Sequence, residues 1–405
     1  MKKFHITNFI FLLLPVLIIG QNSGIDFRKI DDLKTVIATA KNENKNIFAN
    51  LHYVGCPHCV RMEKNVFNTN EVGEYYNNMF ISLSLDINLD SLGHYLESEY
   101  QLASYPAYLY FDKEGNLQHK DIGYKTPKEL IQIAATAFND SKNFNYYQQI
   151  VTAGDLSAET LRNYFSFGYV PEKDSLINIY LENCEEDKLF SLETWLLLKE
   201  NTQSYNSVYF NHILNNEIEY RKNVGNKEVD DFLISHWVFM VNHWTEWRVN
   251  DFQRNKMKKK LRKTKHPLSE RVINQVDMDV CIQRAIWRKN SKHKFNKMIK
   301  EARQYHLYGY DDYKNYYMAA WVILTHEGNV GKSEIDFGNT LAKASVNLHK
   351  NFENLFIYAH FCKQMGNTQY AIATMNESLQ YKQPNTNTKY IENANNKIEE
   401  WKNAL

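Results

Sequence analysis

The 405-residue sequence lacks any excess of charge of one sign. It has 48 lysine and arginine residues against 47 aspartate and glutamate residues, so its formal net charge is +1. This balance gives no support to a nucleic-acid-binding protein or to a protein held on an anionic membrane by electrostatic attraction. Beyond the first twenty residues, no run is long and apolar enough to cross a bilayer as a helix. We therefore expect no nucleic-acid partner and no integral membrane segment.

Cysteine is also scarce, with five residues in the whole chain. Cys184, Cys281 and Cys362 are far apart, whereas a structural zinc site usually draws on a second close pair of cysteine or histidine residues. We therefore expect no metal and no other cofactor. We interpret these three cysteines as small buried apolar residues, and a structural disulfide between two of them is the alternative.

Residues 1–20 have the composition of a secretory signal peptide. Lys2 and Lys3 give a basic start, and an apolar run of 11 residues from Phe9 to Ile19 follows. Such a run is too short to span a membrane as a helix and has the length of a signal sequence. The sequence therefore predicts a periplasmic or otherwise exported protein, and an uncleaved N-terminal anchor is the alternative.

The two remaining cysteines, Cys56 and Cys59, lie where a strand pattern gives way to a helical one. Residues 46–52 form a short apolar run with the length of a buried strand, and Val60 and Phe67 lie on a helical repeat after the cysteines. A thiol in the first turn of a helix lies near unpaired backbone N–H groups and the positive end of the helix dipole, which stabilise the thiolate. The spacing therefore predicts a redox-active dithiol, and the disulfide itself takes the place of a cofactor.

The order of elements around this pair carries a resemblance. After the CxxC helix come a strand, a helix, a strand that begins directly after Pro106, a turn at residues 114–116, a strand and a helix. This order resembles the thioredoxin fold. Residues 66–72 and 80–86 resemble the exported thioredoxin-like proteins that are related to the C-terminal domain of DsbD. The resemblance implies an α/β domain over residues 25–139, with a mixed sheet flanked by helices.

Position in the sequence suggests roles for the cysteines and Pro57, and the resemblance suggests a role for Pro106. Cys56 comes first, at a helix start expected to be exposed, and is the predicted nucleophile, whereas Cys59 is the predicted resolving thiol. Pro57 suits the first helical turn. In this family the proline that matches Pro106 is cis and packs beside the cysteines, and Tyr105 before it is expected to lie against the disulfide.

The direction of electron flow stays open, and two residues depart from the thioredoxin pattern. His58 beside the sulfur of Cys56 would stabilise a thiolate and make the disulfide more oxidising. The tetrad Cys-Pro-His-Cys also occurs in the periplasmic oxidant DsbA, whereas the DsbD-related family mostly works as a reductant. Thioredoxins carry a buried carboxylate where this chain has Asn50, and a tryptophan where it has Gly55. The loss of the acid predicts slower proton transfer to the resolving thiol, and Gly55 predicts open space beside the nucleophile.

Residues 145–405 differ from the first part of the chain in composition and in the spacing of their apolar residues. They contain three prolines, and their apolar residues recur at spacings of three and four. This pattern predicts an all-α array of helical hairpins. One segment, residues 352–384, resembles a tetratricopeptide repeat, in which Ala359 and Ala371 would allow two helices to approach closely. Gly366 would turn the chain between these helices, and Pro384 would end the second.

Together these features predict an exported thiol–disulfide oxidoreductase. It would exchange disulfides with protein substrates and with a redox partner protein, while the helical region holds one of them near Cys56. The alternative is a non-catalytic interaction scaffold, in which the thioredoxin-like domain is a docking module and its disulfide is structural.

Overall fold

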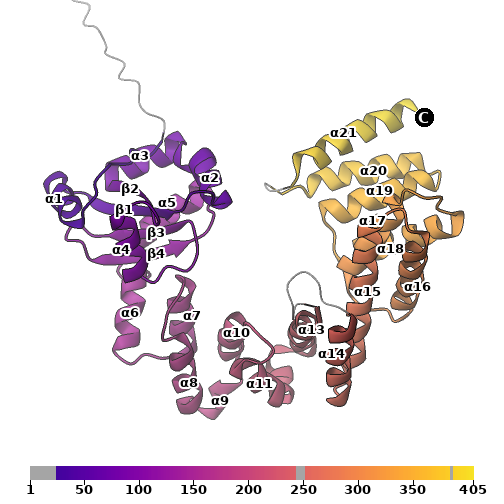
Figure 1. Cartoon of the computed structure of the whole chain (residues 1–405), viewed down its shortest axis with the longest axis horizontal. Coiled ribbons are helices and arrows are strands. Elements are labelled where there is room, and N and C mark those ends of the chain that lie inside the picture. The colour runs from indigo at the N-terminus through magenta and orange to yellow at the C-terminus, as the bar shows by residue number, and fades with distance from the viewer. Residues whose placement is uncertain (1–23, 243–250, 384–385) are drawn as a thin grey trace, which may run out of the picture. The chain divides into compact units, whose positions relative to one another are not determined.

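The computed structural model describes residues 24–242, 251–383 and 386–405 (Figure 1). The chain divides into two compact units, Met1–Glu200 and Asn201–Leu405. The predicted signal peptide lies outside the described residues. Within those residues, no helix combines the length and the apolar character needed to span a membrane.

The first unit contains a four-stranded mixed sheet with the strand order β2–β1–β3–β4. The central strand β1 (Asn46–His52) runs parallel to β2 (Phe80–Asp86) and antiparallel to β3 (Ala107–Phe111). Strand β3 pairs in turn with β4 (Leu117–Ile122) in antiparallel orientation. The mixed sheet predicted from the sequence is therefore confirmed.

Helices cover both faces of this sheet. On one face, α1 (Leu33–Glu43) and α4 (Ser91–Glu99) share an apolar cluster with alternate residues of β1. On the other face lies a second cluster, which contains Phe48 and residues of four helical segments. These segments are α2 (Pro57–Met62), the π-helical turn η1 (Glu63–Phe67), α3 (Asn70–Met79) and α5 (Pro127–Ala137). Because side chains alternate along a strand, β1 contributes to both clusters.

Gly73 in α3 leaves no room for a side chain. A Cβ atom at this position would come within 2.4 Å of the carbonyl oxygen of Gly24. The backbone there is held by the hydrogen bond from the Ile25 N–H to the Phe67 carbonyl (2.8 Å). We expect Gly73→Ala to lower the free energy of unfolding by about 1–3 kcal/mol, as overpacking generally does. Urea unfolding measures this loss. The control Asn78→Ala, at an exposed site of the same helix, should cause none, and equal stability of the two variants would contradict the steric argument.

Five further helices complete the first unit, and they are α6 (Phe144–Thr152), α7 (Ala158–Ser166), α8 (Lys173–Asn183), α9 (Glu186–Leu189) and α10 (Leu192–Asn201). Helix α6 packs on the edge strand β4. At this contact His119 Nδ1 accepts the N–H of Phe144 (3.2 Å). The ammonium group of Lys120 donates to the carbonyl of Tyr169 (2.8 Å), and burial lowers the pKa of Lys120 to about 8. Two buried basic side chains therefore link the sheet to the first helices after it.

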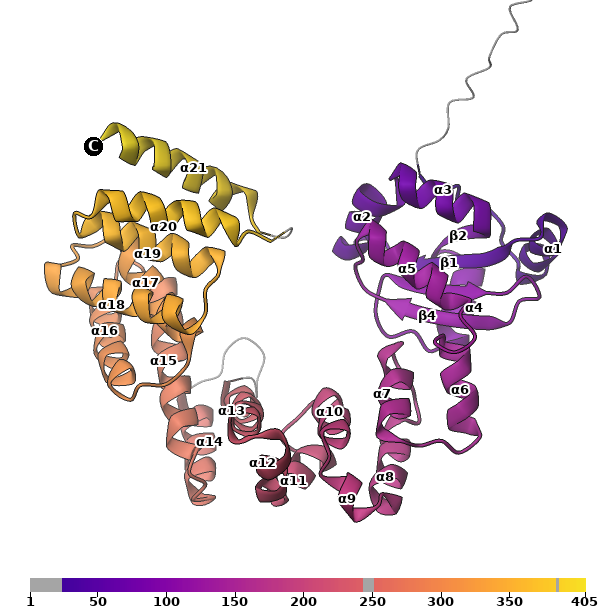
Figure 2. The ribbon, with the colours of Figure 1, turned by 180° about the vertical axis from the view of Figure 1, so that it is seen from behind.

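The described residues of the second unit form helices and no strand (Figure 2). The helices are α11 (Val208–Asn215), α12 (Glu217–Val224), α13 (Asn226–Asn242), α14 (Asp251–Lys263), α15 (Ser269–Trp287), α16 (Lys292–Leu307), α17 (Tyr313–Thr325), α18 (Lys332–Leu348), α19 (Phe352–Gln364), α20 (Thr368–Gln380) and α21 (Thr388–Asn403). From α15 onward, consecutive helices pack against each other as α15–α16, α17–α18 and α19–α20. The prediction of a helical array is confirmed.

The segment that resembles a tetratricopeptide repeat forms the hairpin α19–α20. Ala359 and Ala371 are fully buried, and Gly366 between the helices has a φ of +83°. That backbone angle lies in the left-handed region that glycine adopts without a steric cost. Pro384, the predicted end of the hairpin, lies outside the described residues. The hairpin has the predicted geometry, and its membership of the repeat family stays a prediction.

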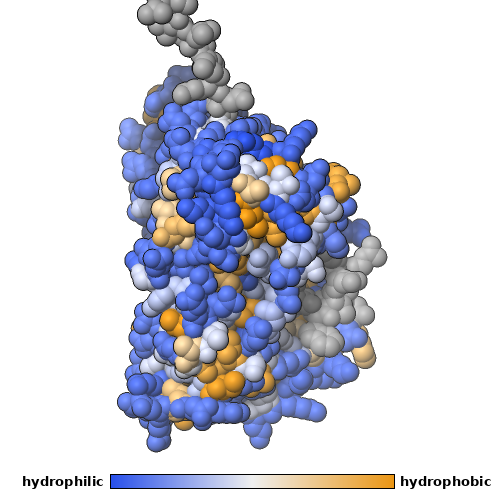
Figure 3. Space-filling model, turned by 90° about the vertical axis from the view of Figure 1, so that its left-hand side faces the viewer, coloured by the Kyte–Doolittle hydropathy of each residue, from blue (hydrophilic) through white to orange (hydrophobic). Residues whose placement is uncertain are grey.

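Figure 3 shows one face of the molecule as mostly hydrophilic, with hydrophobic side chains gathered in small separate patches.

Candidate redox site

The candidate site is a disulfide between Cys56 and Cys59 at the start of α2. Their Cα atoms are 5.3 Å apart. Cys56 is the N-cap of the helix, and its Sγ accepts a hydrogen bond from the N–H of Cys59 (3.2 Å). Pro57 occupies the first helical position, where its missing N–H costs no hydrogen bond. A thiolate on Cys56 would therefore have both a backbone donor and the positive end of the helix dipole beside it.

The prediction that Cys56 is the exposed cysteine is wrong for this disulfide form. Cys56 is only 2% exposed, whereas Cys59 is partly exposed. Cys56 also takes part in two hydrogen bonds with neighbouring backbone groups. The N–H of Cys56 donates to the carbonyl of Tyr53 (3.2 Å), and its sulfur is drawn onto the N–H of Cys59. Cys56 thus combines the N-cap position, which favours a thiolate, with burial of its side chain.

The surface around the disulfide is open. A Cβ atom at Gly55 would meet no other atom within 4 Å, which agrees with the open space expected beside Cys56. His58 is exposed, and in the described part of the chain its imidazole has no hydrogen bond or ion pair. Val54 and Val60 are 77% and 58% exposed, so apolar side chains flank the disulfide. Exposed side chains therefore surround Cys56, although its own sulfur is buried in the disulfide form.

Pro106 and Tyr105 lie at the start of β3. The peptide bond between them is cis, Pro106 is buried, and its carbonyl accepts the N–H of Gly123 (2.7 Å). The ring of Tyr105 packs edge-on against Tyr53, with centroids 5.6 Å apart, and its expected contact with the disulfide stays a prediction. Its hydroxyl donates to the carboxylate of Glu97, and burial together with this contact raises the pKa of Tyr105. Tyr105 therefore supports the loop that leads into Cys56.

Polar side chains line the sheet face beneath α2. Asn50 is buried at 3% exposure, and its Nδ2 donates to Ser84 Oγ (3.1 Å). Its Oδ1 has no hydrogen-bond partner among the described residues. One step further along β1 and β2, His52 Nδ1 lies 3.9 Å from Asp86 Oδ2. Sequence reasoning missed this pair, although both strands end on a polar residue after an apolar run.

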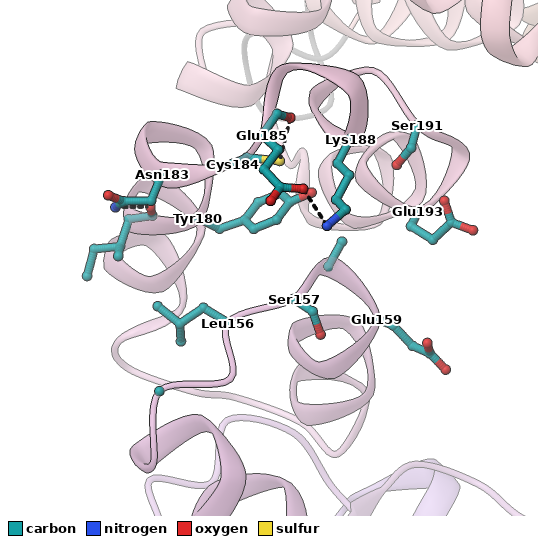
Figure 4. A pocket seen from close by; sticks show the side chains of 13 residues that line it. Leu156, Ser157, Glu159, Tyr180, Asn183, Cys184, Glu185, Lys188, Ser191 and Glu193 are labelled. Atoms are coloured by element: carbon teal, nitrogen blue, oxygen red, sulfur yellow. Dashed lines mark hydrogen bonds and ion pairs between the residues drawn. The ribbon is translucent and has the colours of Figure 1, made fainter.

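The other cysteines are unpaired. Cys281 and Cys362 are buried as expected, but Cys184 is only partly buried, and the alternative of a bridge between two of the three is wrong. Cys184 lines a cavity of about 780 Å³ between α7 and the residues around α9 (Figure 4). Tyr180 and the ion pair Lys188–Glu185 (2.6 Å) lie beside it. Burial raises the pKa of Tyr180 to about 12.

No group of three histidine, cysteine or acidic side chains within residues 24–242, 251–383 and 386–405 could hold a metal ion.

Comparison with known proteins places the first domain in a family. Residues 33–138 match the family model of the thioredoxin-like domain. No curated protein matches the chain. A solution structure of a putative disulphide-isomerase from Bacteroides thetaiotaomicron is 26% identical over 29% of this chain and 96% of its own, with a TM-score of 0.27. The oxidised C-terminal domain of Neisseria meningitidis DsbD is 19% identical over 27% of this chain and 96% of its own, with a TM-score of 0.24. A DsbH oxidoreductase is 11% identical over 32% of this chain and 93% of its own, with a TM-score of 0.24. The match to the family model identifies residues 33–138 as a thioredoxin-like domain, as the order of strands, cysteines and proline in the sequence predicts.

Proposed function

We propose that the protein is an exported thiol–disulfide oxidoreductase that acts on protein substrates through Cys56 and Cys59. The observation that carries the proposal is the position of Cys56 as the N-cap of α2, where its sulfur accepts the N–H of Cys59. That position lowers the cost of a thiolate, which is both the attacking and the leaving form in disulfide exchange. Export is inferred from the sequence of residues 1–20.

The exchange proceeds in two steps. A thiolate on Cys56 attacks a substrate disulfide, one substrate sulfur leaves as a thiolate, and a mixed disulfide joins Cys56 to the other. Cys59 then loses its proton and attacks the sulfur of Cys56, which releases the second substrate thiolate and restores the disulfide. The same steps in reverse deliver a disulfide to a substrate dithiol. The exposed Val54 and Val60 suit an apolar polypeptide at the site, and the helical array is proposed to hold a substrate or a redox partner.

A second candidate function is a docking scaffold with a structural disulfide. The burial of Cys56 favours it, because a shielded sulfur is less accessible to a thiolate. So does Asn50, an amide that cannot transfer a proton where thioredoxins carry an acid.

Equilibration in graded glutathione buffers, with thiols alkylated and counted by mass, separates the two functions. We expect the pair to equilibrate. A potential near that of DsbA, about −120 mV, would indicate a disulfide donor, and one near that of thioredoxin, about −270 mV, a reductant. A pair that stays oxidised at every ratio would contradict the enzymatic proposal and support the scaffold.

A further inference from the structure

His52 ends β1 on the sheet face that α2 covers. Phe48 on the same strand packs with Met62 of α2 in one apolar cluster. Side chains two and four positions apart on a strand share a face, so His52 is directed to the same side as Phe48. The hydrogen bond from the Cys56 N–H to the Tyr53 carbonyl closes a tight turn directly after His52. The first turn of α2, with both cysteines, therefore starts next to the end of β1 that carries this imidazole.

Asp86 occupies the matching position on β2 and is an incompletely paired buried carboxylate. Its side chain is 7% exposed, and Oδ1 accepts the N–H groups of Asn88 (2.8 Å) and Leu89 (3.2 Å). Oδ2 has no hydrogen-bond partner among the described residues, and His52 Nδ1 lies 3.9 Å from it. Asp90, whose carboxylate accepts the N–H of Asp86, adds a second acidic group nearby. Burying an unpaired carboxylate oxygen is costly, and the imidazole of His52 is the basic side chain recorded beside this one.

The charged and titratable side chains of α2 and η1 are arranged differently. His58, Arg61 and Glu63 are all exposed, and the guanidinium of Arg61 lies over the ring of Tyr124, 4.3 Å from its centroid. Charges on exposed side chains are screened by water and salt, whereas a partly buried charge is screened much less. The side chain of His52 is 30% exposed. Of the two histidines close to the cysteines in the sequence, His52 is the one with a carboxylate beside its ring.

We propose that His52, positioned by Asp86, stabilises the thiolate that forms when the Cys56–Cys59 disulfide is reduced, which extends the thiol–disulfide exchange proposed above. Two thiols of the reductant, glutathione or a substrate, supply two electrons and two protons and become one disulfide. The Cys56–Cys59 bond breaks, one cysteine takes a proton, and the other stays a thiolate while the imidazole takes the second proton. Nδ1 of His52 faces Asp86, and the ring lies on the sheet face that α2 covers. His52 is a positioning residue, because it acts on the reaction through its effect on the charge of the sulfur. In this chain Asn50 stands where thioredoxins carry an acid.

The test compares the glutathione equilibrium of the full chain with that of His52→Gln between about pH 5 and pH 8, where histidine titrates. We expect His52→Gln to shift the equilibrium about tenfold toward the disulfide, or about 30 mV, because an opposite charge near a thiolate changes its proton affinity by that order. The variant should also lose part of the pH dependence, and its thiolate absorbance should appear at higher pH. The same replacement at His58 is the matched control and should shift the equilibrium less than the change at His52.

Three outcomes would overturn the proposal. One is a His52→Gln variant with the equilibrium and pH profile of the wild type, and another is an equal shift on His58→Gln. Both leave the proposed exchange reaction intact, since the wild-type pair still equilibrates. The third is a wild-type pair that glutathione never reduces, which overturns the exchange reaction as well. Circular dichroism checks the fold. If His52→Gln does not fold, Asp86→Asn is measured in the same way, and a pH profile equal to that of the wild type would then overturn the proposal.

Discussion

Cys59→Ser is expected to accumulate a stable mixed disulfide between Cys56 and a protein substrate. In the wild type, Cys59 attacks this bond and releases the substrate. Serine cannot do so, and the intermediate persists. Cys56→Ser should abolish exchange, because no thiol then occupies the N-cap position where Sγ accepts a backbone N–H. Non-reducing electrophoresis of cell extract, followed by mass spectrometry of the linked peptides, measures both results.

The roles of the two cysteines depend on which effect dominates. Exposure favours attack at Cys59, because Cys56 is 2% exposed in the disulfide form. Thiolate stability favours Cys56, because the helix dipole and the N–H of Cys59 act on its sulfur. We expect thiolate stability to decide, since reduction frees the sulfur of Cys56 from its bond to Cys59. Capture by Cys56→Ser instead of Cys59→Ser would reverse the assignment. The control Cys184→Ser removes the partly buried free thiol and should leave capture unchanged.

The first domain follows from local sequence patterns to a large extent. Strand β1 has the bounds of the apolar run at residues 46–52, and β2 has those of the segment 80–86 that resembles the DsbD-related family. Apolar runs of this length with turn signals at their ends are typical of buried strands. The helix after the cysteines was less predictable. The helical spacing of its apolar residues suggests one continuous helix through Phe67, but the helix changes to a π-helical turn from Glu63 onward.

The candidate site was only partly predictable, because its contacts join distant segments. The spacing of Cys56 and Cys59 predicts the dithiol, and the resemblance identifies Pro106. The contact of His52 with Asp86 depends on the parallel register of β1 and β2, which no local pattern specifies. The burial of Cys56 is likewise a property of the folded chain that its spacing from Cys59 does not reveal. Functional contacts of this kind are set by tertiary structure.

The helical region shows the same limit on burial. Helical spacing of the aromatic residues predicts that they form the core, and Trp195, Trp237 and Trp401 are buried. Trp287, at the end of α15, is 70% exposed. The last turn of a helix can extend past the helices that pack against it. The helical spacing of apolar residues in the sequence continues through such a turn all the same. Periodicity therefore identifies the face of a helix more reliably than it identifies how much of that face is covered.

Two histidines are expected to make the protein unstable in mild acid, one in each unit. Burial lowers the pKa of His119 to about 4, and Lys125 adds to this effect. Burial likewise lowers the pKa of His360 to about 4, with Lys397 adding to it. In the unfolded chain a histidine has a pKa of about 6.5. Between these values the unfolded state binds more protons than the folded state, so the free energy of unfolding falls as the pH falls from about 6.5 to about 4.

For His119 the expected loss between pH 7 and pH 5 is about 2 kcal/mol, since each tenfold difference in proton binding contributes about 1.4 kcal/mol. His119→Gln should remove most of this loss in the first unit. Glutamine does not titrate, and its side-chain oxygen can accept the Phe144 N–H that now donates to Nδ1. Hydrogen exchange of the amides in β3 and β4 measures the stability of the first unit, and exchange in α19 and α20 measures that of the second. His360→Gln is the reciprocal control, because it should protect α19 and α20 and leave β3 and β4 as acid-sensitive as before. An unchanged acid response of β3 and β4 in His119→Gln would show that the buried imidazole does not set the acid stability of this unit.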